Sequence, residues 1–129
     1  MPPDSGSPAD WIRHARSDLA LARQKAEGEV LPETLCFHAQ QAAEKAIKAV
    51  LIQCGIPVPR THSIERLVGL LPVSIERTHL LIEAADLTSY AGELRYPSDE
   101  GFVSEDDHAE SVRIAEMVVR WAEGIVGIT

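Results

Sequence analysis

The chain has 129 residues, a length typical of one domain with a single core. Its formal net charge of −8 disfavours a strong free-standing affinity for nucleic acid, because phosphate contacts need clustered Lys and Arg side chains. Hydrophobic residues make up 45% of the sequence and aromatic residues only 5%, which favours helices over sheets. No apolar stretch could span a bilayer, and Met1–Ser7 has neither a basic region nor an apolar core, so we expect a cytoplasmic protein.

Helix caps and apolar residues at helical spacing predict five helices in chain order. The first starts at the sequence Ser7-Pro8-Ala9-Asp10, a capping pattern, and Gly28 ends it. The last starts at Ser104, with acids in its first turn. The five helices are expected over residues 7–28, 32–54, 63–72, 74–96 and from 104 onward.

Four of these helices are long and one is short, which predicts an all-α, up-and-down bundle with one short crossing helix. Residues 1–6 are expected to form a disordered N-terminal tail, and residues 7–129 a single helical domain. Cys36 and Cys54 fall in one predicted helix and too far apart to pair, so we expect two buried, reduced thiols. The histidines lack metal-binding spacing, and no metal site is expected.

One strip of the second helix carries polar side chains. His38, Gln41, Lys45 and Lys48 are spaced by three, four and three residues, so they lie along the same side of the helix. Two ammonium groups, an imidazole and an amide on one strip could bind a phosphate or an acidic partner. The alternative is a solvated face on which Glu44 and Lys48 form an ordinary i,i+4 pair.

Two further segments could bind an anion. Arg95 and Tyr96 precede Pro97 at a predicted helix end, where the guanidinium could bind phosphate and the ring could stack on a base. Alternatively, they are a helix cap and a ring that covers the core edge. His62 and Ser63 precede the short helix, whose first N–H groups favour anions, although such a pair is also an ordinary cap. With no Gly-rich phosphate loop and no nucleophile signature, we assign no catalytic residue.

Three blocks in order resemble the HEPN domain family, a nucleotide-binding family of prokaryotes and eukaryotes, over about residues 9–126. They are the sequence from Cys36 to Ala49, then Gly55-Ile56-Pro57 followed by Thr61-His62-Ser63-Ile64, and then Leu87-Thr88 through Tyr90 to Arg95-Tyr96-Pro97. The resemblance implies a helical bundle that usually dimerises. It also implies a minimal nucleotidyltransferase as partner, because many members are encoded beside or fused to one.

On this resemblance we expect a non-catalytic module that binds ATP or another nucleotide and forms a toxin–antitoxin-like pair with the nucleotidyltransferase. Arg95 would contact phosphate and Tyr96 would stack or hydrogen-bond. Charge and polar contacts would come from Lys45, Lys48, His38, Gln41, His62 and Ser63. Tyr96 could itself be a target of nucleotidylation.

The alternatives are a metal-independent ribonuclease toxin acting on RNA and a purely structural interaction domain. Ribonuclease members of the family carry an Arg followed, after four to six residues, by a His, and no Arg in this chain has that spacing. The nearest His downstream of Arg95 is His108, thirteen residues on. Ribonuclease chemistry would therefore need Arg95 to meet His108 or His38 in space.

Overall fold

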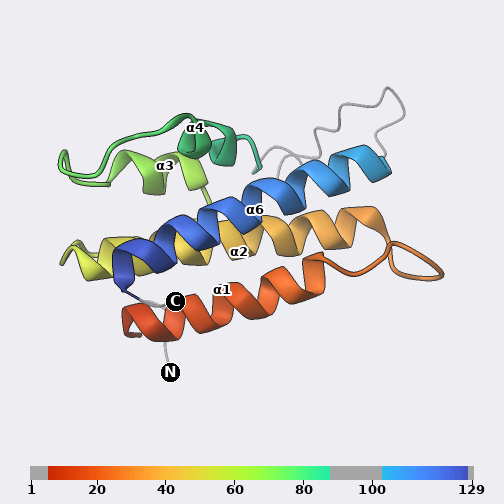
Figure 1. The fold of residues 1–129 in the computed structure, drawn as a ribbon, viewed down its shortest axis with the longest axis horizontal. Coiled ribbons are helices and arrows are strands. Elements are labelled where there is room, and N and C mark those ends of the chain that lie inside the picture. Colours follow the sequence, from red (N-terminus) through yellow and green to blue (C-terminus); the bar gives the residue numbers. More distant parts are fainter. Residues whose placement is uncertain (1–5, 88–102, 128–129) are drawn as a thin grey trace.

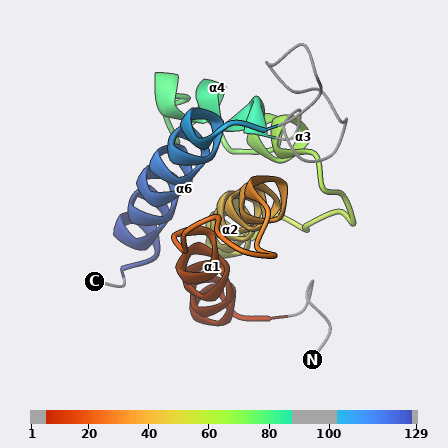
Figure 2. The same ribbon diagram turned by 90° about the vertical axis from the view of Figure 1, so that its right-hand side faces the viewer.

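In the computed structural model, residues 6–87 and 103–127 are described. All regular elements in these ranges are helices, which confirms the all-α class: α1 (Pro8–Ala22), α2 (Pro32–Gln53), α3 (Ile64–Gly69), α4 (His79–Ala85) and α6 (Glu105–Val126). Figure 1 shows α1, α2 and α6 as long rods lying side by side, with α2 in the middle. The short helices α3 and α4 lie on the other side of α2 and α6 from α1 (Figure 2).

Local capping starts three of the helices where the sequence predicted. The side chain of Ser7 accepts from the N–H of Asp10, and the Asp10 carboxylate accepts from the N–H of Ser7 in return. The same reciprocal pair forms at the start of α6 between Ser104 and Asp107. Ser63 caps α3 through the N–H of Arg66. These contacts satisfy N–H groups that a helix leaves without partners.

The core forms around α2, which packs against both α1 and α6. Alanines at the α2 interfaces keep the side-chain volume between neighbouring helices small, and they are Ala39, Ala42, Ala43, Ala46 and Ala49. Larger buried side chains fill the remaining space, among them Ile12, Ile47, Leu51, Leu67, Leu81 and Val118. No helix in the described part of the chain is long and apolar enough to cross a membrane.

The first helix ends six residues before the predicted stop. α1 ends at Ala22, whose carbonyl oxygen lies 2.6 Å from Nε2 of His108 on α6. A carbonyl only accepts, so this ring nitrogen carries the proton and caps the helix end. Gly28 adopts a positive φ of 60° in the connector to α2, beyond the helix.

The fourth helix begins later than expected. After Pro72 the chain turns, with the N–H of Ile75 bonded to the Pro72 carbonyl, and α4 starts only at His79. The Arg77 guanidinium donates to the carbonyl oxygen of Leu71 at 2.8 Å, which holds this turn against the end of α3. α4 ends at Ala85, and residues 88–96 of the predicted helix lie outside the described residues.

The two cysteines lie in different environments. Cys36 is buried on α2, and burial raises the pKa of its thiol. Cys54 is exposed, because it is the C-cap residue where α2 ends and the chain turns away. The expectation of two buried thiols is therefore wrong for Cys54, which lies at the helix end beyond the last buried turn.

Candidate functional site

A pocket of about 350 Å³ lies where α1, α2 and the connector after α2 meet. From α2 come Gln41, Glu44, Lys45 and Lys48, a polar strip at helical spacing. The other walls are the Trp11 side chain of α1 and connector residues Val58, Pro59, Arg60, Thr61 and His62. The pocket thus combines cationic side chains with an aromatic and apolar wall.

The connector is held against α2 at both ends. Gly55 has a φ of 75°, a left-handed conformation that lets the chain reverse after α2, and the N–H of Ile56 bonds back to the Leu51 carbonyl at 2.9 Å. At the far end the Gln40 amide donates to the His62 carbonyl oxygen at 3.3 Å. These contacts fix the position of His62 above α2.

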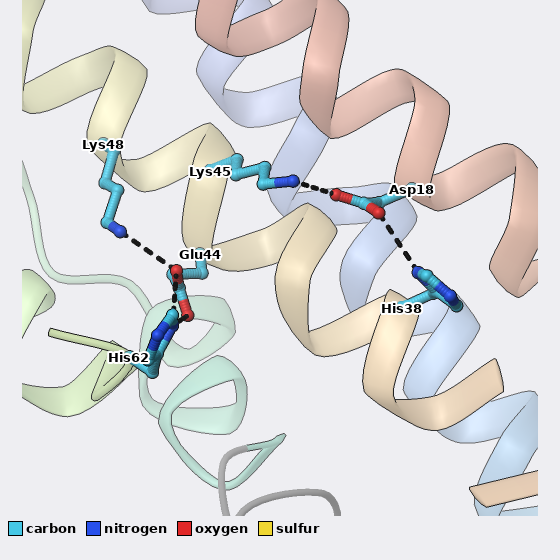
Figure 3. A network of polar contacts seen from close by, with 6 residues as sticks. All are labelled: Asp18, His38, Glu44, Lys45, Lys48 and His62. Carbon is cyan, nitrogen blue, oxygen red and sulfur yellow. Dashed lines mark hydrogen bonds and ion pairs between the residues drawn. The ribbon is translucent and has the colours of Figure 1, made fainter. Parts of the chain in front are cut away.

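Glu44 is the centre of the first polar triad. Its carboxylate accepts from Lys48 Nζ at 3.0 Å and lies 3.1 and 3.2 Å from Nδ1 of His62 (Figure 3). Glu44 is only 2% exposed and Lys48 only 7%. Lys48 Nζ also lies 5.4 Å from the centroid of the Trp11 ring, within cation–π range. The strip is therefore not an ordinary solvated face, because this i,i+4 pair is buried.

Asp18 is the centre of a second triad of the same composition. Its carboxylate accepts from Lys45 Nζ at 2.6 Å and lies 3.1 Å from Nδ1 of His38 (Figure 3). Asp18 is 7% exposed and comes from α1, whereas Lys45 and His38 come from α2. The two triads therefore join α1, α2 and the connector through charge-assisted hydrogen bonds, which are stronger than neutral ones.

The structure brings together four of the residues predicted to bind nucleotide, namely Gln41, Lys45, Lys48 and His62. His38 does not line the pocket, but it reaches the same network through Asp18. Ser63 lies at the start of α3 as its cap. Arg95 and Tyr96 lie outside the described residues.

Sequence reasoning missed Asp18, Trp11 and Arg60 and misjudged Glu44. Asp18 offered a signal, since it follows Ala15 by three residues on the apolar stripe of its helix, where an unpaired acid would be costly. Trp11 precedes Ala15 by four residues on the same apolar stripe, a position that indicates only a core residue. Nothing in the pattern of the connector marked Arg60 as a residue that lines the pocket.

The histidines of the ribonuclease alternative are both engaged. His108 Nε2 donates to the Ala22 carbonyl, and His38 Nδ1 contacts Asp18. Arg95, the third residue of that alternative, lies outside the described residues. In the ranges that the structure describes, no group of three His, Cys, Asp or Glu side chains could hold a metal ion.

Comparison with known protein families identifies the family of this chain. The sequence model of the HEPN domain matches residues 8–125, nearly the whole chain. The chain belongs to the HEPN domain family. Among curated proteins no match is found. Residues from the first two of the three sequence blocks that resemble the family line this pocket. The first block lies on α2, and the second lies in the connector that contains His62.

Two solved structures share the HEPN fold of this chain. The crystal structure of TT1696 from Thermus thermophilus is 26% identical, with a TM-score of 0.77, and the match covers 92% of this chain and 97% of that one. The structure of ST0689, described as an archaeal HEPN homologue, is 30% identical with a TM-score of 0.71 and covers 94% and 98%. The likeness extends over the whole bundle in both proteins.

Proposed function

We propose that this HEPN domain binds a nucleotide, ATP or a related one, without acting on it, and that a minimal nucleotidyltransferase is its partner in a toxin–antitoxin-like pair. The observation that carries the proposal is the pocket that Lys45, Lys48, Arg60 and Trp11 line together. Its volume of about 350 Å³ is in the range of small-ligand sites, which begins at roughly 300 Å³.

The lysines suit a phosphate. Each ammonium group has three donors, and the carboxylates of Asp18 and Glu44 each hold one ammonium in place. The remaining donors are therefore pre-oriented, which lowers the entropy lost when a ligand binds. The wall formed by Trp11, Val58 and Pro59 offers an apolar surface for the sugar or the base.

Arg95 and Tyr96 complete the proposed site from the segment outside the described residues. A guanidinium can hold a phosphate with two parallel hydrogen bonds, and a tyrosine ring can stack on a base. Homodimerisation is proposed as well, on the strength of family membership. The nucleotidyltransferase would supply the chemistry, since the acid that lines the pocket, Glu44, is engaged by Lys48 and His62.

Calorimetric titration with ATP tests the binding. Lys45→Gln and Arg95→Gln each remove one charge-assisted contact, worth about 1.5–3 kcal/mol, so affinity should fall by about tenfold or more. Arg120→Gln is the matched control, because Arg120 lies exposed on α6 away from the pocket, and its affinity should equal that of wild type. Equal affinities for all four proteins, or no binding to wild type, would refute the proposal.

The partner is tested separately. Mixing the domain with the minimal nucleotidyltransferase of the same genome should give one complex in size-exclusion chromatography with light scattering. The domain alone should elute with the mass of a dimer. Two separate peaks in the mixture would remove the nucleotidyltransferase from the proposal and leave nucleotide binding to the calorimetric test.

A further inference from the structure

The two triads have the same composition but differ in their relation to the pocket. Each consists of an imidazole, a buried carboxylate and an ammonium group, and only His62 of the two histidines lines the pocket. We infer that the pocket binds the phosphate group of its ligand together with a proton, which His62 takes up at Nε2. This inference rests on the proposed nucleotide binding and adds the protonation state of His62 in the complex.

The contact with Glu44 determines which ring nitrogen of His62 can gain or lose a proton. A carboxylate only accepts, so Nδ1 of His62, 3.1 Å from one carboxylate oxygen, carries a hydrogen in both charge states of the ring. Nε2 is therefore the atom that gains or loses the proton. The side chain of His62 is 83% exposed and lines the pocket, while that of Glu44 is 3% exposed, so a ligand in the pocket can reach the ring of His62.

Protonation changes Nε2 of His62 from a hydrogen-bond acceptor into a hydrogen-bond donor. With a neutral ring, Nε2 presents a lone pair, which repels a phosphate oxygen. With a charged ring, the same atom donates a hydrogen bond, and a charge-assisted one. A phosphate oxygen beside Nε2 therefore favours the protonated form, and imidazole is the side chain whose charge ordinarily changes between pH 5 and 8.

The charges around His62 favour the same coupling. On α2, Glu44 and Lys48 cancel, and Lys45 is cancelled by Asp18 of α1. The connector contributes Arg60, and α3 contributes Glu65 and Arg66 in its first turn, a pair of opposite charges. A terminal phosphate carries close to two negative charges at neutral pH. A positive charge on His62 would offset part of the charge of such a ligand.

His38 provides an internal reference. Its Nδ1 lies 3.1 Å from Asp18, so it repeats the chemistry of His62, but its side chain does not line the pocket. A proton taken up through the general electrostatics of the network would involve both histidines. A proton taken up through contact with the ligand would involve His62 alone.

Calorimetry at pH 6.0–8.0, in buffers of different ionisation enthalpy, measures the protons taken up on binding. ATP, inorganic phosphate and sulfate are the ligands, and sulfate has no titration of its own in this range. His62→Asn keeps a donor near the Nδ1 position and cannot titrate; His62→Gln is the second variant should the first be poorly folded by circular dichroism. His38→Asn is the comparison for the proton number, because it removes the corresponding imidazole outside the pocket. His79→Asn is the control for affinity, because this exposed His pairs with Glu83 and does not line the pocket.

Wild type and His79→Asn should lose affinity for the anion as pH rises, by up to about tenfold per pH unit relative to His62→Asn, the limit for one proton. For the same ligand, His62→Asn should take up fewer protons on binding than wild type, by up to one. The titration of ATP itself contributes equally to both proteins and therefore cancels in this difference. Equal proton numbers in wild type and both His62 variants, with ATP bound, overturn this inference alone. Proton-linked binding of sulfate without any binding of ATP supports it and overturns the proposed function. No binding of any of the three anions overturns both.

Discussion

The ion pairs beside the pocket differ in burial from those on the outer surface of α6. Beside the pocket, Asp18 and Glu44 are almost fully buried and each holds a Lys and a His. On the outer surface of α6, Glu116 pairs with Arg23 at 3.1 Å and with Arg120 at 4.0 Å, and the three side chains are 30–75% exposed. The Glu44–Lys48 and Glu116–Arg23 pairs nevertheless have similar N···O distances, 3.0 and 3.1 Å.

The difference shows which charges this fold depends on. An exposed pair exchanges hydration for a weak Coulomb attraction and contributes about 0–1 kcal/mol. Removing one member of a buried pair leaves an uncompensated charge out of water and costs about 3–5 kcal/mol. The fold therefore depends much more on the buried acids near the pocket than on the exposed acid Glu116 on α6. The same buried acids orient the ammonium groups that would contact a ligand.

The largest expected effect follows from neutralising the central acid. Glu44→Gln keeps the shape of the side chain but leaves the buried Lys48 ammonium without a counter-charge. We expect the free energy of unfolding to fall by about 3 kcal/mol or more. Chemical denaturation at pH 7, followed by circular dichroism, measures it.

A double variant serves as its control. Glu44→Leu combined with Lys48→Met replaces both charges with apolar side chains of similar volume, and it should recover most of the lost stability. A loss in Glu44→Gln of less than about 1 kcal/mol would place this pair in the same class as the exposed ones and remove the contrast between the regions.

The sequence predicted those parts of the fold that depend on neighbours in the chain. Capping residues and 3.6-residue periodicity act locally, and the starts of α1, α3 and α6 and the whole of α2 were predicted within a residue or two. α1 ends early because His108, 86 residues away, binds the carbonyl of Ala22. α4 starts late because Arg77 holds a turn against Leu71, six residues before it. Neither contact is part of the helical periodicity from which the helix bounds were predicted.

The candidate site likewise has one part that the local sequence predicts and another that depends on contacts between separate segments. Gln41, Lys45 and Lys48 could be identified from one helix, because i,i+3 and i,i+4 spacing places them on one side. The acid that holds Lys45 belongs to another helix, and the burial of Glu44 results from the connector folding over α2. A polar strip predicted from spacing therefore located the pocket without showing that its charges are paired.

The matched substitution on the outer surface should have a much smaller effect. Glu116→Gln makes the same chemical change as Glu44→Gln and removes the partner of Arg23 and Arg120. We expect a loss of less than about 1 kcal/mol at low salt, shrinking further at about 0.5 M salt, because salt screens exposed charges. The loss in Glu44→Gln should be nearly independent of salt. A similar cost for both substitutions in the same denaturation experiment would contradict the distinction by burial.

The smallest effect concerns Glu110, an exposed acid on α6. Its hydrogen bond to the Arg113 guanidinium, at 2.5 Å, lowers its pKa, and Arg113 is also held by Glu83 at 2.7 Å. A lowered folded-state pKa means that this contact stabilises the fold above the ordinary Glu pKa of about 4.3 and that the contribution is lost as pH falls through the lower, folded value.

The carboxyl chemical shift of Glu110, followed by NMR between pH 2 and 6, should therefore show a titration midpoint below the ordinary value in wild type. Arg113→Gln should return the midpoint toward it, while the unfolding free energy at pH 7 changes little because the side chains are exposed. An unchanged midpoint would mean that the pair does not persist in solution. A shifted midpoint with almost unchanged stability would show that a close ion pair on this surface affects a titration without supporting the fold, in contrast to the buried acids beside the pocket.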